Sequence, residues 1–230
     1  MVIFRALLVA VVFFMAQGVA SAQTGGIRVA PVLVSLSPER AIGSVRLHNG
    51  RATPVSFEVE AFVWTQVDGA DRLTPTNALI VAPGVFEIAP NSEQTLRLGV
   101  RGPSSNSEAA YRILVRELPA PRRDGVALGF ALEMSLPVFV TPRGARPNLT
   151  THAEGQHLIL TNAGSSFAQI ALLSGDQRLE APRYLLAGSS AAIALPAPAP
   201  AIRLIEAHAG GQQSERTIHV GQSVQHASVR

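Results

Sequence analysis

The stretch GVALGFALEMSLPVFVTP, residues 125–142, alternates large apolar side chains with small or polar ones over an unusual length. Successive side chains of an extended strand point to opposite faces, so this period of two predicts a β-strand with one apolar face. The apolar positions are Val126, Leu128, Phe130, Leu132, Met134 and Leu136. Such a row of side chains must be covered, either by the chain's own core or by another protein.

The same period of two recurs along the first half of the chain, and no stretch shows helical periodicity with capping residues. The predicted strands are 27–36, 43–49, 55–66, 78–83, 93–101, 110–118 and 126–140. Turn-forming pairs such as Asn49-Gly50, Asp68-Gly69 and Asp124-Gly125 separate several of them. Short strands at this spacing predict an all-β fold of the immunoglobulin-like sandwich type.

The segment TPRGARPN, residues 141–148, breaks the pattern with two prolines and a glycine, which predicts a linker. Shorter predicted strands follow it, at 157–162, 166–173, 177–180, 183–186, 190–195, 201–208 and 215–220. We therefore expect an immunoglobulin-like domain over 23–142 and a smaller β-sandwich domain over 143–230.

Residues 1–22 have the pattern of a secretory signal peptide. Arg5 precedes an apolar run from Ala6 to Ala16, and Ala20 and Ala22 form an A-x-A cleavage site. The apolar run is too short to span a bilayer permanently. The pattern predicts cleavage after Ala22 and an exported mature protein.

Composition excludes several kinds of chemistry. The chain has no cysteine, which removes thiol catalysis and cysteine–zinc sites. Its net charge of +3 comes from scattered arginines, and this pattern does not indicate nucleic-acid binding. The histidines lack metal-ligand spacing, and the nucleophile-elbow and phosphate-loop motifs are missing. Asp68 and Asp71 fit a hairpin turn better than a cation site. We expect no enzyme activity, no cofactor and no small-molecule substrate.

Four segments together resemble the PapD-like periplasmic chaperones of the chaperone–usher pilus pathway. They are VAPVLVSLSP (29–38), TPTNALIVAPGVFEIAPNSEQTLRLG (74–99), YRILVRELP (111–119) and LEMSLPVFVTP (132–142). The order and spacing of these segments carry the resemblance. The motifs FVWTQ and SLPVFVTP are most similar to the archaic branch of the family, whose subunits are of the spore-coat-U type. The resemblance implies two sandwiches in an L-shaped or boomerang arrangement.

The resemblance also implies a function for the long alternating strand. Pilus subunits of this pathway are immunoglobulin-like folds that lack their last strand, and the chaperone lends its own strand to fill the gap, a form of β-strand addition. Leu128, Phe130 and Leu132 would then occupy the central donor positions. Val126, Met134 and Leu136 would extend the row. The implied partners are pilus subunits and an outer-membrane usher, and the exposed strand could also support self-association.

Two family features cannot be transferred to this chain. Leu33 and Pro137 stand where better-known relatives have the basic pair that binds the subunit's terminal carboxylate. The candidate anchors here are Arg112, which we rank first, and then Arg97, Arg101 and Arg116; for each one singly, a solvated arginine is an equally good interpretation. Thr141 stands where relatives have an arginine that pairs with the acid corresponding to Glu108. This leaves open whether Glu108 keeps an interdomain ion pair.

Two alternative functions remain open from the sequence. The first is an exported two-domain adhesion or surface module whose alternating strand packs internally. Without the resemblance, this internal packing would be the better interpretation of the alternation. The second is a hydrolase whose site is invisible in the sequence.

Overall fold

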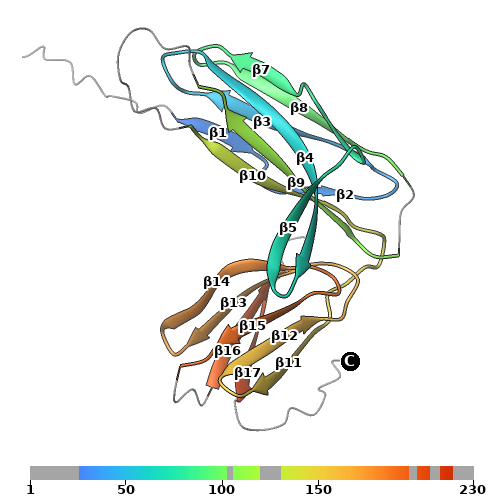
Figure 1. Ribbon diagram of the computed structural model, residues 1–230, viewed down its shortest axis with the longest axis vertical. Helices are drawn as coiled ribbons and strands as arrows, with labels where there is room; N and C mark the ends of the chain where they lie inside the picture. Colours follow the sequence, from blue (N-terminus) through green and yellow to red (C-terminus); the bar gives the residue numbers. More distant parts are fainter. Residues whose placement is uncertain (1–25, 103–105, 120–130, 197–200, 208–212, 220–230) are drawn as a thin grey trace, which may run out of the picture.

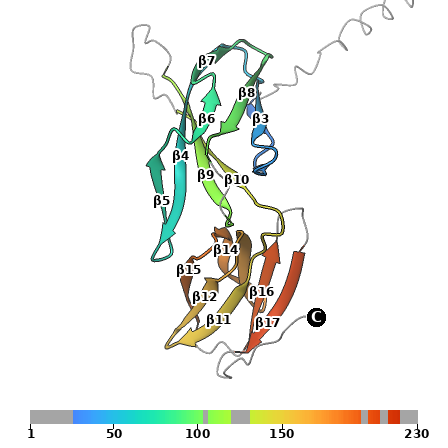
Figure 2. The ribbon, with the colours of Figure 1, turned by 90° about the vertical axis from the view of Figure 1, so that its right-hand side faces the viewer.

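The computed structural model describes residues 26–102, 106–119, 131–196, 201–207 and 213–219. These residues form two bodies of β-structure, set at an angle to each other, as Figures 1 and 2 show. Within the described ranges there is no helix that could cross a membrane. The predicted signal peptide, residues 1–22, lies outside the described residues.

The first body is a sandwich of two sheets. In spatial order, one sheet contains β1 (Ile27–Ala30), β3 (Ile42–Asn49), β8 (Glu93–Val100) and β6 (Leu79–Ala82). The other contains β2 (Val34–Leu36), β10 (Glu133–Val140), β9 (Ala109–Glu117), β4 (Val55–Val67) and β5 (Ala70–Pro75), with β7 (Val85–Ile88) also paired to β4.

The second body is a smaller sandwich. One of its sheets consists of β11 (Leu149–Glu154), β12 (His157–Asn162) and β15 (Ser190–Ala194). The other consists of β14 (Gln177–Leu185), β13 (Ala168–Ser174), β16 (Ala201–Ala207) and β17 (Gln213–His219). The expected all-β fold with two sandwiches in a bent arrangement is confirmed (Figure 1).

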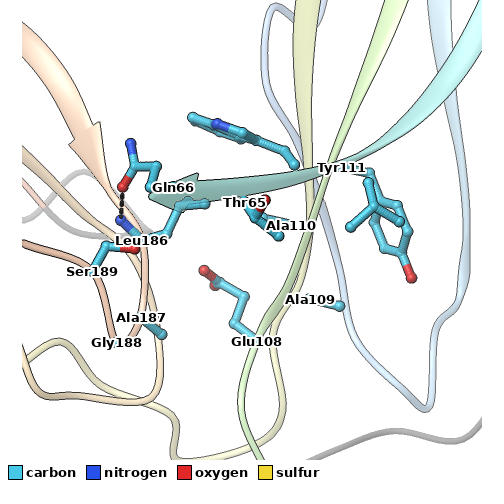
Figure 3. Close-up of a pocket in the computed structure, with 12 residues that line it drawn as sticks. Thr65, Gln66, Glu108, Ala109, Ala110, Tyr111, Leu186, Ala187, Gly188 and Ser189 are labelled. Carbon is cyan, nitrogen blue, oxygen red and sulfur yellow. Dashed lines mark hydrogen bonds between the residues drawn. The ribbon is translucent and has the colours of Figure 1, made fainter. Parts of the chain in front are cut away.

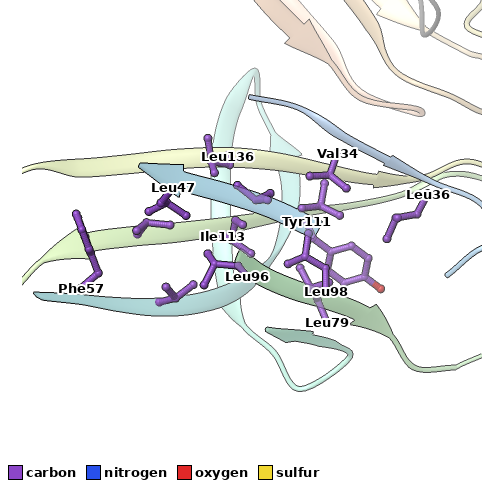
Figure 4. Packing of buried hydrophobic residues seen from close by; sticks show 14 of the residues in the cluster. Val34, Leu36, Leu47, Phe57, Leu79, Leu96, Leu98, Tyr111, Ile113 and Leu136 are labelled. Carbon is purple, nitrogen blue, oxygen red and sulfur yellow. The ribbon is translucent and has the colours of Figure 1, made fainter. Parts of the chain in front are cut away.

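Alternation within the strands explains how each sandwich is held together. Every second side chain of the long strands points into the space between the sheets, and Figure 4 shows these side chains from both sheets in contact. Val45, Leu47 and Leu96 on one sheet and Phe57 and Ile113 on the other are completely buried. Cores of this kind stabilise both bodies without disulfides, since the sequence has no cysteine.

Several strands differ from the sequence-based expectation. The expected strand 27–36 is split, because the chain crosses from one sheet to the other between β1 and β2. The expected strands 177–180 and 183–186 form the single strand β14. Strands β5, β7 and β11 were not predicted: β5 is exposed along its whole length, and β7 is a short edge pairing on β4. Strand β5 has no buried face for alternation to reveal, and β11 is exposed over most of its length after the buried Leu149. Strand β7 does alternate, with Val85 exposed and Ile88 buried, but over only four residues.

Candidate functional site

Strand β10 contains the described part of the predicted donor strand, and its two edges differ. One edge pairs with β9 along its whole length, from Glu133 opposite Arg116 to Val140 opposite Ala109. The other edge pairs with β2, in parallel, at 138–140 alone. Among the residues that the structure describes, no strand pairs with this second edge over 133–137. This segment is therefore an open edge of the sheet.

The register of the ladder determines which backbone groups the open edge presents. The amide of Glu117 donates to the carbonyl of Leu132 (2.8 Å), so Leu132 directs its polar backbone groups towards β9. Backbone direction alternates along an antiparallel strand, so Glu133 and Ser135 direct theirs towards the open edge. Pro137 is the next residue in that series and has no N–H to offer. The open edge thus presents two amides before a proline ends the donor series.

The side chains of β10 separate into an apolar face and a mostly polar one. On the apolar face, Leu136 is buried in the core of its own sandwich, while Met134 is half-buried against that core. Leu132, just before the strand, is also half-buried. The predicted donor residues Val126, Leu128 and Phe130 lie outside the described residues. Leu136 is thus already committed to this chain's core, whereas Leu132 and Met134 are partly accessible.

The four candidate arginines lie in different places. Arg97 is on β8, in the opposite sheet of the first sandwich, and Arg101 is exposed just after that strand. Arg116 forms ion pairs with Glu60 and with Glu133, the latter at 2.7 Å, on an exposed surface. Of the four, Arg112 is the one the structure places beside residues of the second sandwich.

Arg112 lies on a surface of aromatic and polar groups. Its guanidinium carbon is 3.8 Å from the centre of the Trp64 ring, a distance at which a cation interacts with the face of the ring. Its Nη1 donates to the Ser135 hydroxyl (3.2 Å), and its Nη2 is 3.7 Å from an Asp71 oxygen. Burial lowers the pKa of Arg112 from its ordinary value, while Asp71 and Tyr184 oppose that shift. Arg112 remains a cation, since its ordinary pKa is far above neutral.

An aromatic cluster joins the two sandwiches next to Arg112. Trp64 and Phe139 come from the first sandwich, and Phe167, Tyr184 and Leu186 come from the second. The Phe139 and Phe167 rings stack with centroids 4.0 Å apart, and Trp64 meets Tyr184 edge-on at 5.6 Å. The Trp64 Nε1–H is buried without a hydrogen-bond partner in the described part of the chain. Apolar packing, rather than charge, therefore dominates the centre of this junction.

The β4–β5 hairpin reaches the second sandwich and hydrogen-bonds to it. Gln66 accepts a bond from the amide of Leu186 (2.9 Å) and donates to the carbonyl of Tyr184 (3.0 Å). Arg183 donates to the carbonyl of Gly69 (2.6 Å) at the hairpin turn. Asp68 and Gly69 adopt positive φ angles of 52° and 75°, as the predicted tight turn requires. The hairpin thus fixes one side of the junction.

Glu108 fixes the other side of the junction without a cation. Thr141, in the linker, donates to one carboxylate oxygen (2.5 Å), and the amide of Phe167 donates to the other (2.8 Å). The amide of Glu108 itself donates to the carbonyl of Ser165 (2.9 Å). Burial raises the pKa of Glu108, and the bonds from Thr141 and Phe167 oppose the rise. Among the described residues, Glu108 therefore holds the domains by hydrogen bonds and has no ion pair.

Between the two sandwiches lies a cavity of about 370 Å³, bordered by residues of both. Figure 3 shows Glu108, Gln66 and Tyr111 around it, with Leu186, Ala187 and Gly188 on the side of the second sandwich. In the described part of the chain, no group of three or more histidine or acidic side chains could hold a metal ion. The junction offers an arginine, a carboxylate and aromatic surface, which suit binding rather than bond-breaking chemistry.

The sequence did not reveal most of this junction. Trp64 is the chain's single tryptophan, and Tyr184 is one of two tyrosines. Their rarity was the feature of the sequence that could have marked them as candidate site residues. No sequence pattern indicated that Gln66 would bond to the backbone of a distant strand.

Comparison with known proteins adds a family match. The family model described as "Pili and flagellar-assembly chaperone, PapD N-terminal domain" matches residues 26–146, which is more than half of the chain. No curated protein matches the chain by sequence.

Several solved structures have the same fold. One is a chain of the CsuC–CsuE chaperone–tip adhesion subunit pre-assembly complex from archaic chaperone-usher Csu pili of Acinetobacter baumannii, with 21% identity, a TM-score of 0.69 and coverage of 86% of this chain and 100% of that chain. Another is in the Salmonella enterica SafA pilin–SafB chaperone complex, with 14% identity, a TM-score of 0.70 and coverage of 85% of this chain and 97% of that chain. A third is the E. coli chaperone DraB, with 15% identity, a TM-score of 0.68 and coverage of 85% of this chain and 97% of that chain. At these identities the likeness establishes a shared fold.

Proposed function

The chain belongs to the family of pili and flagellar-assembly chaperones with a PapD-type N-terminal domain, and from this premise we propose how it works. It acts in the periplasm, binds incomplete pilus subunits by donating a β-strand, and delivers them to an outer-membrane usher. It does so without enzymatic chemistry, ATP or a cofactor. In this proposal the domain over 23–142 donates the strand, and the domain over 143–230 completes the cleft between the two domains.

The observation that carries the proposal is the open edge of β10. A subunit strand that pairs there would accept hydrogen bonds from the amides of Glu133 and Ser135, as β-strand addition requires. The other edge of β10 stays bonded to β9, so the donated strand would remain part of its own sheet. The chaperone can therefore complete a partner's fold without unfolding its own.

The apolar face supplies the side chains for the partner's groove. Leu132 and Met134 are half-buried in the described structure. In the sequence, the alternation continues the same apolar row upstream through Val126, Leu128 and Phe130. Fully covering an exposed apolar side chain of this size stabilises a complex by roughly 1.5–3 kcal/mol, and Leu132 and Met134 contribute less because they are already half-buried. The total is on the order of 10 kcal/mol before the costs of association and ordering are subtracted. Leu136 is left out of this row because its own core already covers it.

Arg112 is the group that we propose for the subunit's terminal carboxylate. A planar guanidinium can bind a carboxylate through two parallel hydrogen bonds. Arg112 lies directly opposite Pro137 in the β9–β10 ladder, so a cation absent from β10 is present one strand away. It is also beside Tyr184 of the second sandwich, in the angle between the domains.

The same open edge could pair with a second copy of this chain when no subunit is present. Unpaired strand edges associate readily, and a charged or proline-containing edge limits this. Glu133 and Pro137 are such features here. Self-association through this edge would compete with subunit binding.

The experiment that tests strand donation compares substitutions on the two faces of the same segment. Leu132→Asp and Phe130→Asp would place a carboxylate in the partner's groove, whereas Ala131→Asp would place it on the opposite face. We expect the first two variants to remain folded and soluble but to lose co-purification with a co-expressed pilus subunit. The Ala131→Asp variant should retain it.

The alternative function, an adhesion module whose strand packs internally, predicts a different result. In that case Leu132→Asp and Phe130→Asp would destabilise the first sandwich, with a lower midpoint of denaturation. Subunits would co-purify with none of the proteins, the parent chain included. The circular dichroism of each variant separates the two explanations.

A further inference from the structure

The proposed carboxylate anchor already has an acidic neighbour in the same chain. One oxygen of Asp71, on β5, is 3.7 Å from Nη2 of Arg112, which is within range of an ion pair but beyond a hydrogen bond. The Arg112 side chain is 17% exposed and that of Asp71 is 47% exposed. The cation is thus largely enclosed, while the acid beside it remains open to solvent.

Asp71 is held at this distance by the junction between the domains. Gln66 lies directly opposite it in the β4–β5 ladder and donates to the other Asp71 oxygen (2.9 Å). The same amide nitrogen donates to the carbonyl of Tyr184, and the amide oxygen accepts from Leu186. Gln66 therefore fixes Asp71 relative to the second sandwich.

The other groups around Arg112 leave one part of the guanidinium for a ligand. Its Nη1 donates to Ser135 and its face rests on the Trp64 ring. Its Nη2, on the side of Asp71, has no hydrogen-bonded acceptor among the described residues. A carboxylate that binds in two-point fashion must approach Nη2, where the Asp71 charge repels it.

We propose that Asp71 is an internal competitor for the carboxylate anchor: its side chain occupies the Nη2 side of Arg112 in the free protein and weakens the binding of a subunit's terminal carboxylate. This inference rests on the proposed function of Arg112. Gln66 links Asp71 to the second sandwich by hydrogen bonds. The strength of the competition therefore depends on the orientation of the two domains relative to each other. Release of the subunit is easier with this competitor than without it.

Trp64 provides a direct optical signal for this site. It is the single tryptophan of the chain, and Arg112 rests on its ring. The probe is N-acetyl-leucine, a small carboxylate, and its matched control is N-acetyl-leucinamide, which has no charge. Titration of the purified protein with each compound, followed by tryptophan fluorescence, reports binding at Arg112.

Three variants separate the competitor from the anchor. Asp71→Asn keeps the shape and can still accept the bond from Gln66, but it removes the charge. Arg112→Gln removes the anchor. Glu93→Gln is the control, because Glu93 is an acid of similar exposure (51%) that pairs with Arg46 on the other sheet at 3.6 Å.

We expect Asp71→Asn to lower the half-saturating concentration of N-acetyl-leucine by about threefold, the size of one partly exposed charge pair. Glu93→Gln should leave it unchanged, Arg112→Gln should abolish the response, and the amide should give no response in any protein. An unchanged or weaker response in Asp71→Asn, with Arg112→Gln inactive, would overturn the competitor and leave the anchor intact. An Arg112→Gln protein that responds like the parent chain would contradict the anchor itself, and the competitor with it.

Discussion

The two ends of β10 are built for different tasks. At one end, Leu136–Val140, every side chain is buried, and β2 covers the outer edge over 138–140. At the other end, Glu133–Ser135, two of the three side chains are exposed and the outer edge is open. We call these the sealed end and the open end. The difference teaches that one strand can hold its own sandwich together and still offer a free edge to a partner.

The largest expected effect is at the sealed end. Leu136→Ala removes a side chain that is 6% exposed and leaves a cavity in the first core. We expect a loss of about 2–4 kcal/mol in the free energy of unfolding, measured by chemical denaturation. A loss below about 1 kcal/mol would mean that this end is not sealed, and the contrast with the open end would disappear.

The next effect concerns the linker, into which the sealed end runs. Glu108→Ala leaves the Phe167 amide and the Thr141 hydroxyl without their acceptor, and we expect a loss of about 1–3 kcal/mol by denaturation. Glu108→Gln is the control, since its amide can accept from Phe167 and donate to Thr141. If Glu108→Gln is as damaging as Glu108→Ala, the junction depends on the negative charge rather than on these hydrogen bonds.

The same residue gives a pH dependence with a definite sign. Burial raises the folded-state pKa of Glu108 above its ordinary value of 4.5, so folding disfavours the ionised carboxylate. The parent chain should therefore lose stability relative to Glu108→Gln as the pH rises from 4.5 through the raised pKa, and the difference should be constant above it. Denaturation midpoints of both proteins across this range measure it. A difference that grows in the opposite direction would contradict the burial of this carboxylate.

The smallest effect on stability is expected at the open end. Met134→Ala changes the residue two positions before Leu136 on the same face, where the side chain is only half-buried. We expect a loss of about 1 kcal/mol or less in the free energy of unfolding, but clearly weaker retention of a co-expressed subunit. The pair Met134→Ala and Leu136→Ala thus separates binding from folding, and equal effects on both quantities would remove the distinction.

Alternation made most of the fold predictable from the sequence. Strands such as β3, β8 and β9 bury every second side chain over much of their length, and their positions follow from the period of two. The position of strand β5 could not be predicted in this way. All of its residues are exposed, so its sequence has no apolar face that alternates with a polar one. Its importance lies in what the hairpin contacts in the other sandwich.

The site was less predictable than the fold. The row that ends at Leu136 was visible as a pattern, but the point where its side chains pass from the core to the open end lies close to where β2 begins, with Val34 opposite Val138. Arg112 could be proposed from its position, yet its partners Trp64, Asp71 and Ser135 come from three other strands. Contacts between segments this far apart in the sequence leave no local periodicity, so the structure was needed to find them.

Amide hydrogen exchange along β10, measured residue by residue by NMR with and without a bound pilus subunit, tests strand donation most directly. In the free protein, the amides of Glu133 and Ser135 should exchange fast, and those of Met134 and Leu136, which face β9, should be protected. Binding should protect Glu133 and Ser135 and change the other two little. If Glu133 and Ser135 exchange at the same rate in the complex as in the free protein, no strand pairs with the open edge, and the proposed mechanism is wrong.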